Sequence, residues 1–207
     1  MPNDASPYAP LLAHIARYVA LTEDEQAALL AELAVCTLPR KACLLEQDHV
    51  CTASYFVLQG CLRMYFISDK GAEQITHFAI ENWWLADYTS LSTQTPSQFF
   101  VQAVEPSTVA LLDYQQQESL LSRVPKLERY FRLMMQRVTA AAQMRILYLY
   151  GQSGEQRYHH FATAFPDFVQ RVPQYMLASY LGFTPEFLSK IRAKAAHQAL
   201  RSPSSGS

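Results

Sequence analysis

Several features that mark other classes of protein are absent or scarce in this sequence. No Cys-x-x-Cys pair occurs among the four cysteines, so a zinc or iron–sulfur site has no supporting spacing. Charged residues make up only 17% of the chain and hydrophobic residues 50%, which excludes disorder over most of its length. No apolar run approaches the roughly 20 residues that span a bilayer. The first ten residues, MPNDASPYAP, lack the basic-then-apolar order of a secretory signal, so we expect a cytoplasmic protein with no membrane partner.

Motifs of common enzyme classes are also missing. The sequence has no Gly-x-Ser-x-Gly, no phosphate-binding loop and no Ser, His and Asp in a catalytic order, so we do not expect an enzyme. In a cytosolic protein the default for cysteine is a reduced thiol that packs as a small hydrophobe. A redox switch stays open as an alternative, because all four cysteines fall within residues 36–61. They are Cys36, Cys43, Cys51 and Cys61.

Charge is unevenly distributed along the chain. Residues 1–154 hold 11 Lys and Arg against 15 Asp and Glu, whereas residues 155–207 hold six against three. A mildly acidic body with a small basic end indicates that the end meets a polyanion.

The first two thirds of the chain change from helical to strand-like patterning. Apolar spacing predicts a helix over residues 8–19, and a capping box from Thr22 to Glu25 predicts another over about 23–34. From Val35 to Tyr114 the pattern breaks into segments of 5–8 residues that are rich in β-branched and aromatic side chains. Gly60 and the Asp69-Lys70-Gly71 cluster are expected at hairpin turns. Seven or eight short strands joined by short turns predict an antiparallel barrel or jelly roll.

Helical spacing returns after Tyr114 and predicts a long helix over about 125–150. This helix is apolar on two faces, so it needs two packing partners. One can be its own barrel and the other the same helix of a second subunit; a single large intramolecular core is the alternative. The predicted dimer seam is Leu127, Phe131, Met134, Val138, Ala141 and Arg145. The second apolar face is Tyr130, Leu133, Ala140, Met144 and Leu147.

Residues 174–196 have the pattern of a helix, a tight turn and a second helix. Gly182 can take the left-handed conformation that ends the first helix. Thr184 is placed to cap the second helix, with Pro185 at its favoured first position. The expected inward-facing residues are Tyr175, Leu177, Ala178, Leu181, Leu188 and Ile191. Polar and basic side chains are left on the outer face of the second helix, which is typical of a helix-turn-helix that enters a DNA major groove.

The motif divides into two kinds of candidate DNA contact. Glu186 and Lys190 lie four residues apart on one helical face and are the predicted base readers, because Glu accepts from cytosine and Lys donates to guanine. Pro185 lies in the same first turn and has no side-chain donor. The predicted phosphate contacts are Gln174, Thr184, Ser189, Arg192 and Lys194.

The segments SYFVLQGCLRMYFISDKGAEQITHFAIENWWLADYTSL and LASYLGFTPEFLSKIR resemble the barrel and the helix-turn-helix of the bacterial Crp/Fnr family of transcription regulators. The resemblance implies an α+β fold: an N-terminal antiparallel β-barrel or jelly roll with flanking helices, a long dimerisation helix and a C-terminal helical helix-turn-helix domain. The corresponding domains are residues 1–124, 125–153 and 154–207. The implied partners are a second copy of the chain, double-stranded DNA, RNA polymerase and an unknown small-molecule effector.

The cyclic-nucleotide cassette of that family is incomplete in this chain. Its Gly-Glu pair matches Ala86 and Asp87, and its phosphate-binding Arg falls near Ser97. Residues 71–122 contain no Lys or Arg and six acidic residues, and a buried phosphate needs a cation or several donors. We therefore expect neither a cofactor nor a cyclic nucleotide; a neutral ligand or a closed pocket remain as alternatives. The candidate effector pocket is Arg63, Trp84, Ala86, Asp87, Tyr88, Ser97, Gln98 and Phe99. The sequence gives no reason to expect Arg63, or an arginine of the long helix, to replace the missing cation.

The leading hypothesis is a homodimeric DNA-binding regulator. The alternative is a barrel-based protein-interaction or signalling module whose helix-turn-helix no longer reads DNA.

Overall fold

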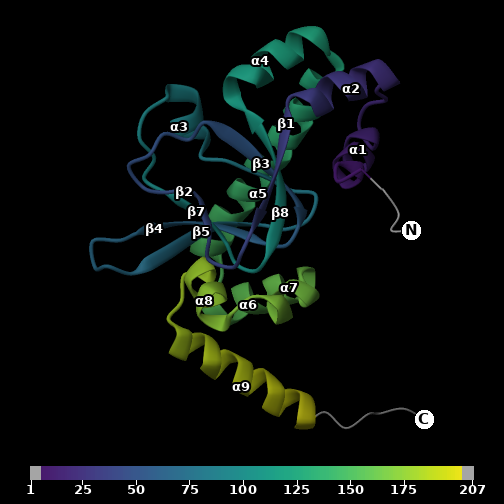
Figure 1. Ribbon diagram of the computed structural model, residues 1–207. Coiled ribbons are helices and arrows are strands. Elements are labelled where there is room, and N and C mark those ends of the chain that lie inside the picture. The colour runs from purple at the N-terminus through teal and green to yellow at the C-terminus, as the bar shows by residue number, and fades with distance from the viewer. Residues whose placement is uncertain (1–5, 202–207) are drawn as a thin grey trace, which may run out of the picture. The chain divides into compact units, whose positions relative to one another are not determined.

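The computed structural model describes residues 6–201, with side chains as far as residue 194. It divides into two compact units, Met1–Thr139 and Ala140–Ser207, which are described separately (Figure 1). Among the described residues, no helix is long and apolar enough to cross a membrane.

Two four-stranded antiparallel sheets face each other in the first unit. One sheet has the strand order β1-β8-β3-β6 and the other β2-β7-β4-β5. The strands are β1 (Leu33–Leu38), β2 (Cys43–Leu45), β3 (Ala53–Gln59), β4 (Leu62–Ile67), β5 (Glu73–Ala79), β6 (Trp84–Leu85), β7 (Phe100–Ala103) and β8 (Ser107–Asp113). The predicted antiparallel barrel or jelly roll is confirmed, and each of the seven predicted strand segments contains a strand.

The turns of the barrel follow the glycines, with one difference from expectation. The Asp69-Lys70-Gly71 cluster joins β4 to β5 in a hairpin, as predicted. Gly60 does not make a hairpin, because β3 and β4 belong to different sheets; it makes the corner between them. Its φ of 101° favours glycine, and an added Cβ would lie 2.7 Å from the Cα of Ser107. Gly60 therefore lets the chain cross from one sheet to the other against β8.

Alternation of side chains gives the barrel an interior core. Ala53, Tyr55 and Val57 of β3 point inward and pack with Leu62 and Met64 of β4. The alternate residues of β3, Phe56 and Leu58, point to the opposite side of their sheet. They belong to a second hydrophobic cluster, hereafter the outer cluster, which also includes Leu11, Leu112, Leu127 and Tyr130. The sheet that contains β3 is therefore apolar on both faces.

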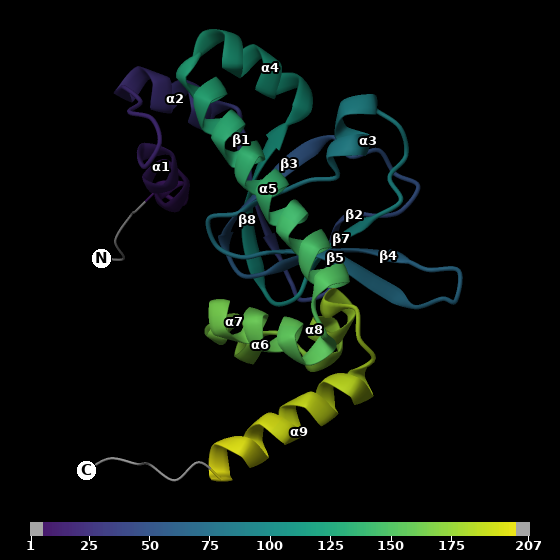
Figure 2. The same ribbon diagram turned by 180° about the vertical axis from the view of Figure 1, so that it is seen from behind.

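Helices cover the outer face of that sheet. The helices of this unit are α1 (Ala9–Ala16), α2 (Glu23–Ala31), α3 (Tyr88–Thr93), α4 (Tyr114–Arg123) and the first half of α5 (Lys126–Gly151). The predicted capping box is present at the start of α2, where Glu25 N donates to Thr22 Oγ1 at 3.2 Å and Thr22 N donates to Glu25 Oε2 at 2.8 Å. Figure 2 shows α5 crossing the sheet that holds β3 and β8, between α1 and α3. The outer cluster packs α1, α5 and this sheet together.

A polar contact lies at the centre of the outer cluster. Tyr130 of α5 is fully buried, and its hydroxyl accepts a hydrogen bond from Trp84 Nε1 at 2.8 Å. The same hydroxyl lies 2.8 Å from His14 Nδ1 of α1. An indole N–H only donates, whereas the direction of the bond between the tyrosine hydroxyl and His14 depends on the histidine tautomer. One side chain of α5 thus joins β6 to α1.

The second unit is helical in its described part. It contains the rest of α5, followed by α6 (Gly154–Ala164), α7 (Pro166–Arg171), α8 (Gln174–Leu181) and α9 (Pro185–Arg201). Leu177, Ala178 and Leu181 of α8 pack inward, as do Leu188 and Ile191 of α9. The predicted helix, turn and helix are confirmed. Together with the barrel they give the predicted α+β architecture.

One predicted inward-facing residue of the motif is wrong. Tyr175 is 49% exposed, and the neighbouring Met176 is buried in its place. α8 begins directly after Pro173, so its first turn is set by the preceding loop. The apolar residues of the second turn of α8 therefore did not reveal which side chain of its first turn faces inward.

Candidate DNA-binding and effector sites

The turn of the helix-turn-helix is built as the sequence predicts. Gly182 has a φ of 76° and caps α8 in the left-handed conformation. Thr184 precedes α9 and its Oγ1 accepts from the backbone N–H of Phe187 at 3.3 Å. Pro185 is the first residue of α9. These three local features fix where the second helix begins and which side chains its first turn presents.

The candidate DNA contacts lie on the outer surface of the second unit. Arg192 is half-buried, and all the others are exposed: Gln174, Thr184, Pro185, Glu186, Ser189, Lys190 and Lys194. The pKa of Glu186 is lowered by its own backbone N–H, by the Thr184 hydroxyl and by the nearby Lys190 charge. Glu186 is therefore ionised and remains an acceptor at neutral pH.

One of these candidates already has a protein partner. Lys194 Nζ lies 2.8 Å from Glu155 Oε1 and 3.1 Å from Oε2, which joins α9 to the first turn of α6. Both side chains are exposed, so the pair is weak and exchangeable. A phosphate would have to compete with Glu155 for this lysine.

The second helix also rests on the start of α6. A Cβ added to Gly154 would lie 2.6 Å from a ring carbon of Phe187, and the Phe183 ring is nearly as close. Phe183 and Phe187 are themselves in edge contact, with ring centroids 5.3 Å apart. This aromatic contact sets the distance between α9 and α6, and only glycine leaves room for it.

The six residues of the predicted dimer seam on α5 do not all face the same way or share one environment. Leu127 is fully buried in the outer cluster of its own unit, and Arg145 Nη2 donates to the Tyr180 carbonyl of α8 at 2.9 Å. Phe131 and Met134 pack partly against the same outer cluster. The two ends of the predicted seam are therefore wrong, because they pack within the chain. Val138 is half-buried and Ala141 is exposed.

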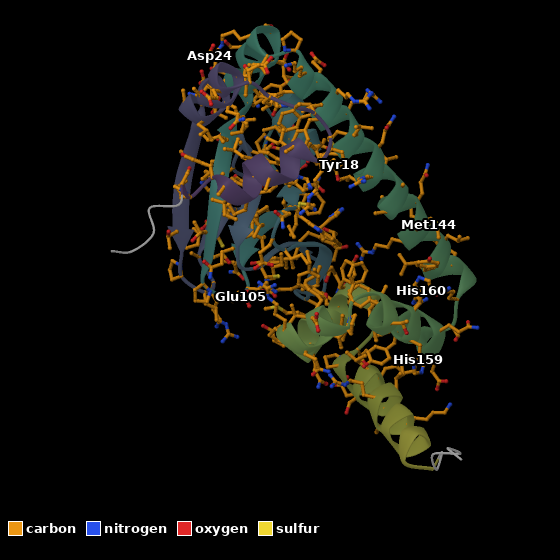
Figure 3. The ribbon with its side chains drawn as sticks, turned by 90° about the vertical axis from the view of Figure 1, so that its right-hand side faces the viewer. Tyr18, Asp24, Glu105, Met144, His159 and His160 are labelled. Carbon is orange, nitrogen blue, oxygen red and sulfur yellow. The ribbon has the colours of Figure 1, made fainter. Side chains whose placement is uncertain are left out.

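The other apolar face of α5 is the one left open. Met144, labelled in Figure 3, is 43% exposed. Leu147 is 57% exposed, and Ala140 is exposed in the same row. Leu133 extends the row by two turns and is half-buried. These four residues, hereafter the open face of α5, follow the spacing of a coiled-coil seam. The sequence showed both faces and gave no sign of which one the chain itself covers.

The residues at the cassette positions form a closed cluster inside the barrel. Asp87 is buried and caps α3 by accepting from the backbone N–H groups of Thr89 and Ser90. Its second oxygen accepts from Ser97 Oγ at 2.7 Å. The side chains at the ribose and phosphate positions of the family's cassette thus bond each other. Ala86 is buried beside them, Gln98 is exposed and Phe99 packs partly against the interior core.

Arg63 lies on the other side of its sheet from this cluster. Its neighbours Leu62 and Met64 belong to the interior core, whereas its guanidinium donates to Gln102 Oε1 at 3.0 and 2.6 Å and to Glu73 at 2.5 Å. The guanidinium also lies 4.1 Å from the ring centroid of Tyr65. Arg63 is only 4% exposed, so it is held on the outer face and is not a substitute cation for the cassette.

Trp84 and Tyr88, by contrast, line a cavity outside the barrel. The cavity has a volume of about 380 Å³ and lies between the β3 sheet, α3, α4 and α5. Sequence reasoning missed most of its lining, because those residues come from four separate segments. The residues around it are Ser54, Trp84, Tyr88, Leu91, Ser92, Tyr114, Gln117, Phe131, Met134 and Met135.

Metal chemistry finds no support in the described part of the chain. Those residues contain no cluster of three or more His, Cys, Asp or Glu that could hold an ion. The four cysteines are free thiols, two of them buried and two half-buried.

Comparison with known proteins finds one domain model and several related regulators. The family model of the cyclic nucleotide-binding domain matches residues 35–124. The fumarate and nitrate reduction regulatory protein of Vibrio cholerae is 27% identical over 148 residues, covering 66% of this chain and 58% of the relative. The anaerobic regulatory protein of Aggregatibacter actinomycetemcomitans is 26% identical over 151 residues, covering 68% and 58%. The chain thus spans less than two thirds of the length of both relatives.

Solved structures with the same fold cover both units. FixK2 from Bradyrhizobium japonicum superposes with a TM-score of 0.68 at 17% identity, covering 84% of this chain and 89% of FixK2. A protein from Eubacterium rectale, described as a transcriptional regulator of the Crp/Fnr family, superposes with a TM-score of 0.64 at 14% identity, covering 86% and 85%. In its barrel, its long helix and its helix-turn-helix, the chain is thus similar to the Crp/Fnr family of transcription regulators and shares the fold of these solved structures.

Proposed function

We propose that the chain is a homodimeric, sequence-specific DNA-binding regulator whose barrel responds to an effector other than a cyclic nucleotide, or to none. The observation that carries this proposal is the outer surface of α9. Its buried side chains, Leu188 and Ile191, face the core, while Glu186, Ser189 and Lys190 are exposed together. A helix held by one face that presents a polar and basic face outward suits insertion into the major groove. Such a protein acts in the cytoplasm and is not an enzyme.

Base reading and phosphate binding are assigned to different residues of α9. Glu186 and Lys190 lie one turn apart near the start of the helix, where base edges are within reach. Arg192 is half-buried and Lys194 is paired to Glu155, so these two are placed at the flank, where phosphates lie. Gln174 and Thr184 sit at the starts of the two helices of the motif and take the same role.

Selection of bound sequences from a random duplex pool, followed by titration of three variants, tests this assignment. Lys190→Ala should lose roughly 1–3 kcal/mol on the selected duplex and little on a scrambled one. Arg192→Ala should weaken both duplexes equally and reduce the salt slope by about one unit. Lys70→Ala is the matched control, since it removes the same charge from the exposed β4–β5 hairpin and should change neither.

The alternative, an interaction module that no longer reads DNA, makes a different prediction. Wild-type protein would then show no salt-dependent retention on duplex DNA, and none of the three variants would alter its behaviour. A ratio of specific to scrambled affinity that is unchanged in Lys190→Ala would refute the base-reading role alone.

Dimerisation is proposed through the open face of α5. Met144 and Leu147 are large apolar side chains that the chain leaves exposed, and in a paired helix they would be buried between two copies. A two-fold dimer would also present two copies of α9 to two half-sites of an operator. Sedimentation of the full chain at micromolar concentration tests the dimer directly.

The side-chain partners of Asp87, Ser97 and Arg63 argue against a cyclic nucleotide as the effector. Asp87 and Ser97 satisfy each other, and Arg63 is engaged with Gln102 and Glu73 on the opposite face of its sheet. A cyclic phosphate entering the barrel would meet the Asp87 carboxylate and no cation. We therefore look for the effector elsewhere in the first unit.

A further inference from the structure

The cavity on the outer face of the β3 sheet has the composition of a ligand pocket. Its volume of about 380 Å³ falls at the small end of the range for such pockets. Trp84, Tyr88, Tyr114 and Phe131 give it aromatic walls. Aromatic faces favour flat π-systems through stacking and edge contacts. Such a lining fits a planar molecule better than a flexible aliphatic one.

No charged residue lines this cavity. Burial raises the pKa of Tyr88 to about 12, so its phenol is also neutral at physiological pH. An ionic ligand would lose its hydration without gaining a partner of opposite charge. The cavity therefore selects against anions in particular, because the negative faces of its aromatic rings offer them no compensation.

Polar groups are nevertheless present in the lining. Ser54, Tyr88, Tyr114 and Gln117 each contribute a side-chain hydroxyl or amide to the lining. Among the described residues, none of these four side chains makes a hydrogen bond to another protein group. Ser54 is 5% exposed, so its hydroxyl has little access to bulk water. These groups can orient one or two polar atoms at the edge of a ligand.

The remaining wall belongs to the helix proposed for dimerisation. Phe131, Met134 and Met135 of α5 close the cavity on one side. Thioether side chains are unbranched and adapt their shape to what they contact. Trp84 packs against Phe131, with ring centroids 5.5 Å apart, and donates to the hydroxyl of Tyr130 on the same helix at 2.8 Å. A molecule in the cavity would therefore touch both the barrel and α5.

We propose that this cavity binds a small, uncharged, planar aromatic molecule, and that the effector of the regulator belongs to this chemical class. The second half of the statement rests on the proposed DNA-binding function, whereas binding itself does not. The site is distinct from the cassette cluster, because Asp87 and Ser97 bond each other and neither lines the cavity.

The test uses 2-acetylnaphthalene as the neutral probe and 2-naphthoate as its anionic counterpart, each titrated into the full chain by calorimetry. We expect 2-acetylnaphthalene to bind once per chain with a dissociation constant at or below roughly 100 μM. We expect 2-naphthoate to bind at least about tenfold more weakly, because its charge would be desolvated. In a Trp83→Phe background, Trp84 is the remaining tryptophan, and its emission should change with the same midpoint.

Two matched pairs of variants locate the bound probe. Ser92→Phe and Gln117→Phe each place a ring in the cavity and should weaken binding at least about tenfold. Thr89→Phe on α3 and Gln116→Phe on α4 add the same ring to exposed positions outside the lining and should stay within about twofold of wild type.

Three results would overturn the inference: no heat of binding for 2-acetylnaphthalene, equal affinity for both probes, or unchanged affinity in Ser92→Phe and Gln117→Phe. Duplex binding measured without probe on the same samples separates this failure from failure of the proposed function. Loss of probe binding with DNA binding intact refutes only the cavity assignment, and the reverse pattern refutes only the regulator.

Discussion

Replacing Tyr130 by Phe removes one oxygen atom from the outer cluster and changes nothing else in its shape. That oxygen accepts from Trp84 Nε1 and shares a hydrogen bond with His14 Nδ1, each over 2.8 Å. Tyr130 is fully buried and His14 is 6% exposed, so water cannot replace the lost partner of the imidazole easily. Trp84 is half-buried, and its N–H is somewhat better placed to find water.

The size of the effect follows from these exposures. A buried polar group left without its partner costs about 1–3 kcal/mol. His14 should fall in the upper part of that range and Trp84 in the lower part, since only Trp84 has access to solvent. We expect Tyr130→Phe to lower the free energy of unfolding of the first unit by about 2–4 kcal/mol.

Urea denaturation followed by tryptophan emission measures this change, because Trp83 and Trp84 both lie in the barrel unit. Tyr114→Phe is the matched control: among the described residues its hydroxyl makes no hydrogen bond, so we expect a loss below about 0.5 kcal/mol. Both variants should keep the wild-type slope with urea. If Tyr130→Phe and Tyr114→Phe proved equally stable, the hydrogen-bonded role of Tyr130 would be refuted.

Four other outcomes can be measured. Burial and the charges of Arg17 and Arg137 lower the pKa of His14 below 6.5, so on acidification this histidine is protonated in the unfolded chain at a higher pH than in the folded one. The free energy of unfolding should therefore fall as the pH drops below about 6.5. The urea midpoint of His14→Phe should lack this part of the pH dependence. Leu147→Asp should raise the dimer dissociation constant at least about a hundredfold by sedimentation, whereas Ile146→Asp, an equally exposed position off the open face, should leave the dimer intact. Calorimetry should show no micromolar binding of cyclic AMP or cyclic GMP, and a clear one-site isotherm for either would contradict the closed Asp87–Ser97 cluster. Gly182→Ala should lower the stability by about 1 kcal/mol in thermal unfolding, because the φ of 76° strains alanine although the added Cβ meets only a Leu149 methyl at 3.6 Å. Gly60→Ala should lower it clearly more, because its φ is also positive and its Cβ would lie 2.7 Å from the Ser107 Cα.

The fold was predictable where the pattern along the chain is local. Strands such as β3 and β8 run for seven residues, long enough for alternation and composition to reveal them. β6 has two residues and α3 has six, so neither completes enough periods to be recognised. Gly60 was identified as a turn, but the choice between a hairpin and a sheet-to-sheet corner depends on which strand β3 pairs with, and that is set by tertiary packing.

The two candidate sites also differ in how far apart their residues lie along the chain. The helix-turn-helix lies within about twenty consecutive residues, so the order of Gly182, Thr184 and Pro185 along the chain is enough to predict it. The cavity draws Ser54, Tyr114 and Met135 from segments far apart in the chain, and no spacing connects them. His14 and Tyr130 are separated by 116 positions and meet only because α1 and α5 share one face of a sheet. The open face of α5 was visible in the sequence but could not be told from the covered one.

If α9 reads DNA as proposed, the contact between Gly154 and Phe187 makes that recognition sensitive to a residue outside the helix-turn-helix. A side chain at position 154 would meet the Phe187 ring at 2.6 Å, and we expect the ring to move and to displace α9 relative to α6. Glu186 and Lys190, on either side of Phe187 along the helix, would move with it, and base contacts tolerate little displacement. A genetic screen for altered operator preference should therefore recover substitutions at position 154, and they would change several base contacts together although residue 154 reads none.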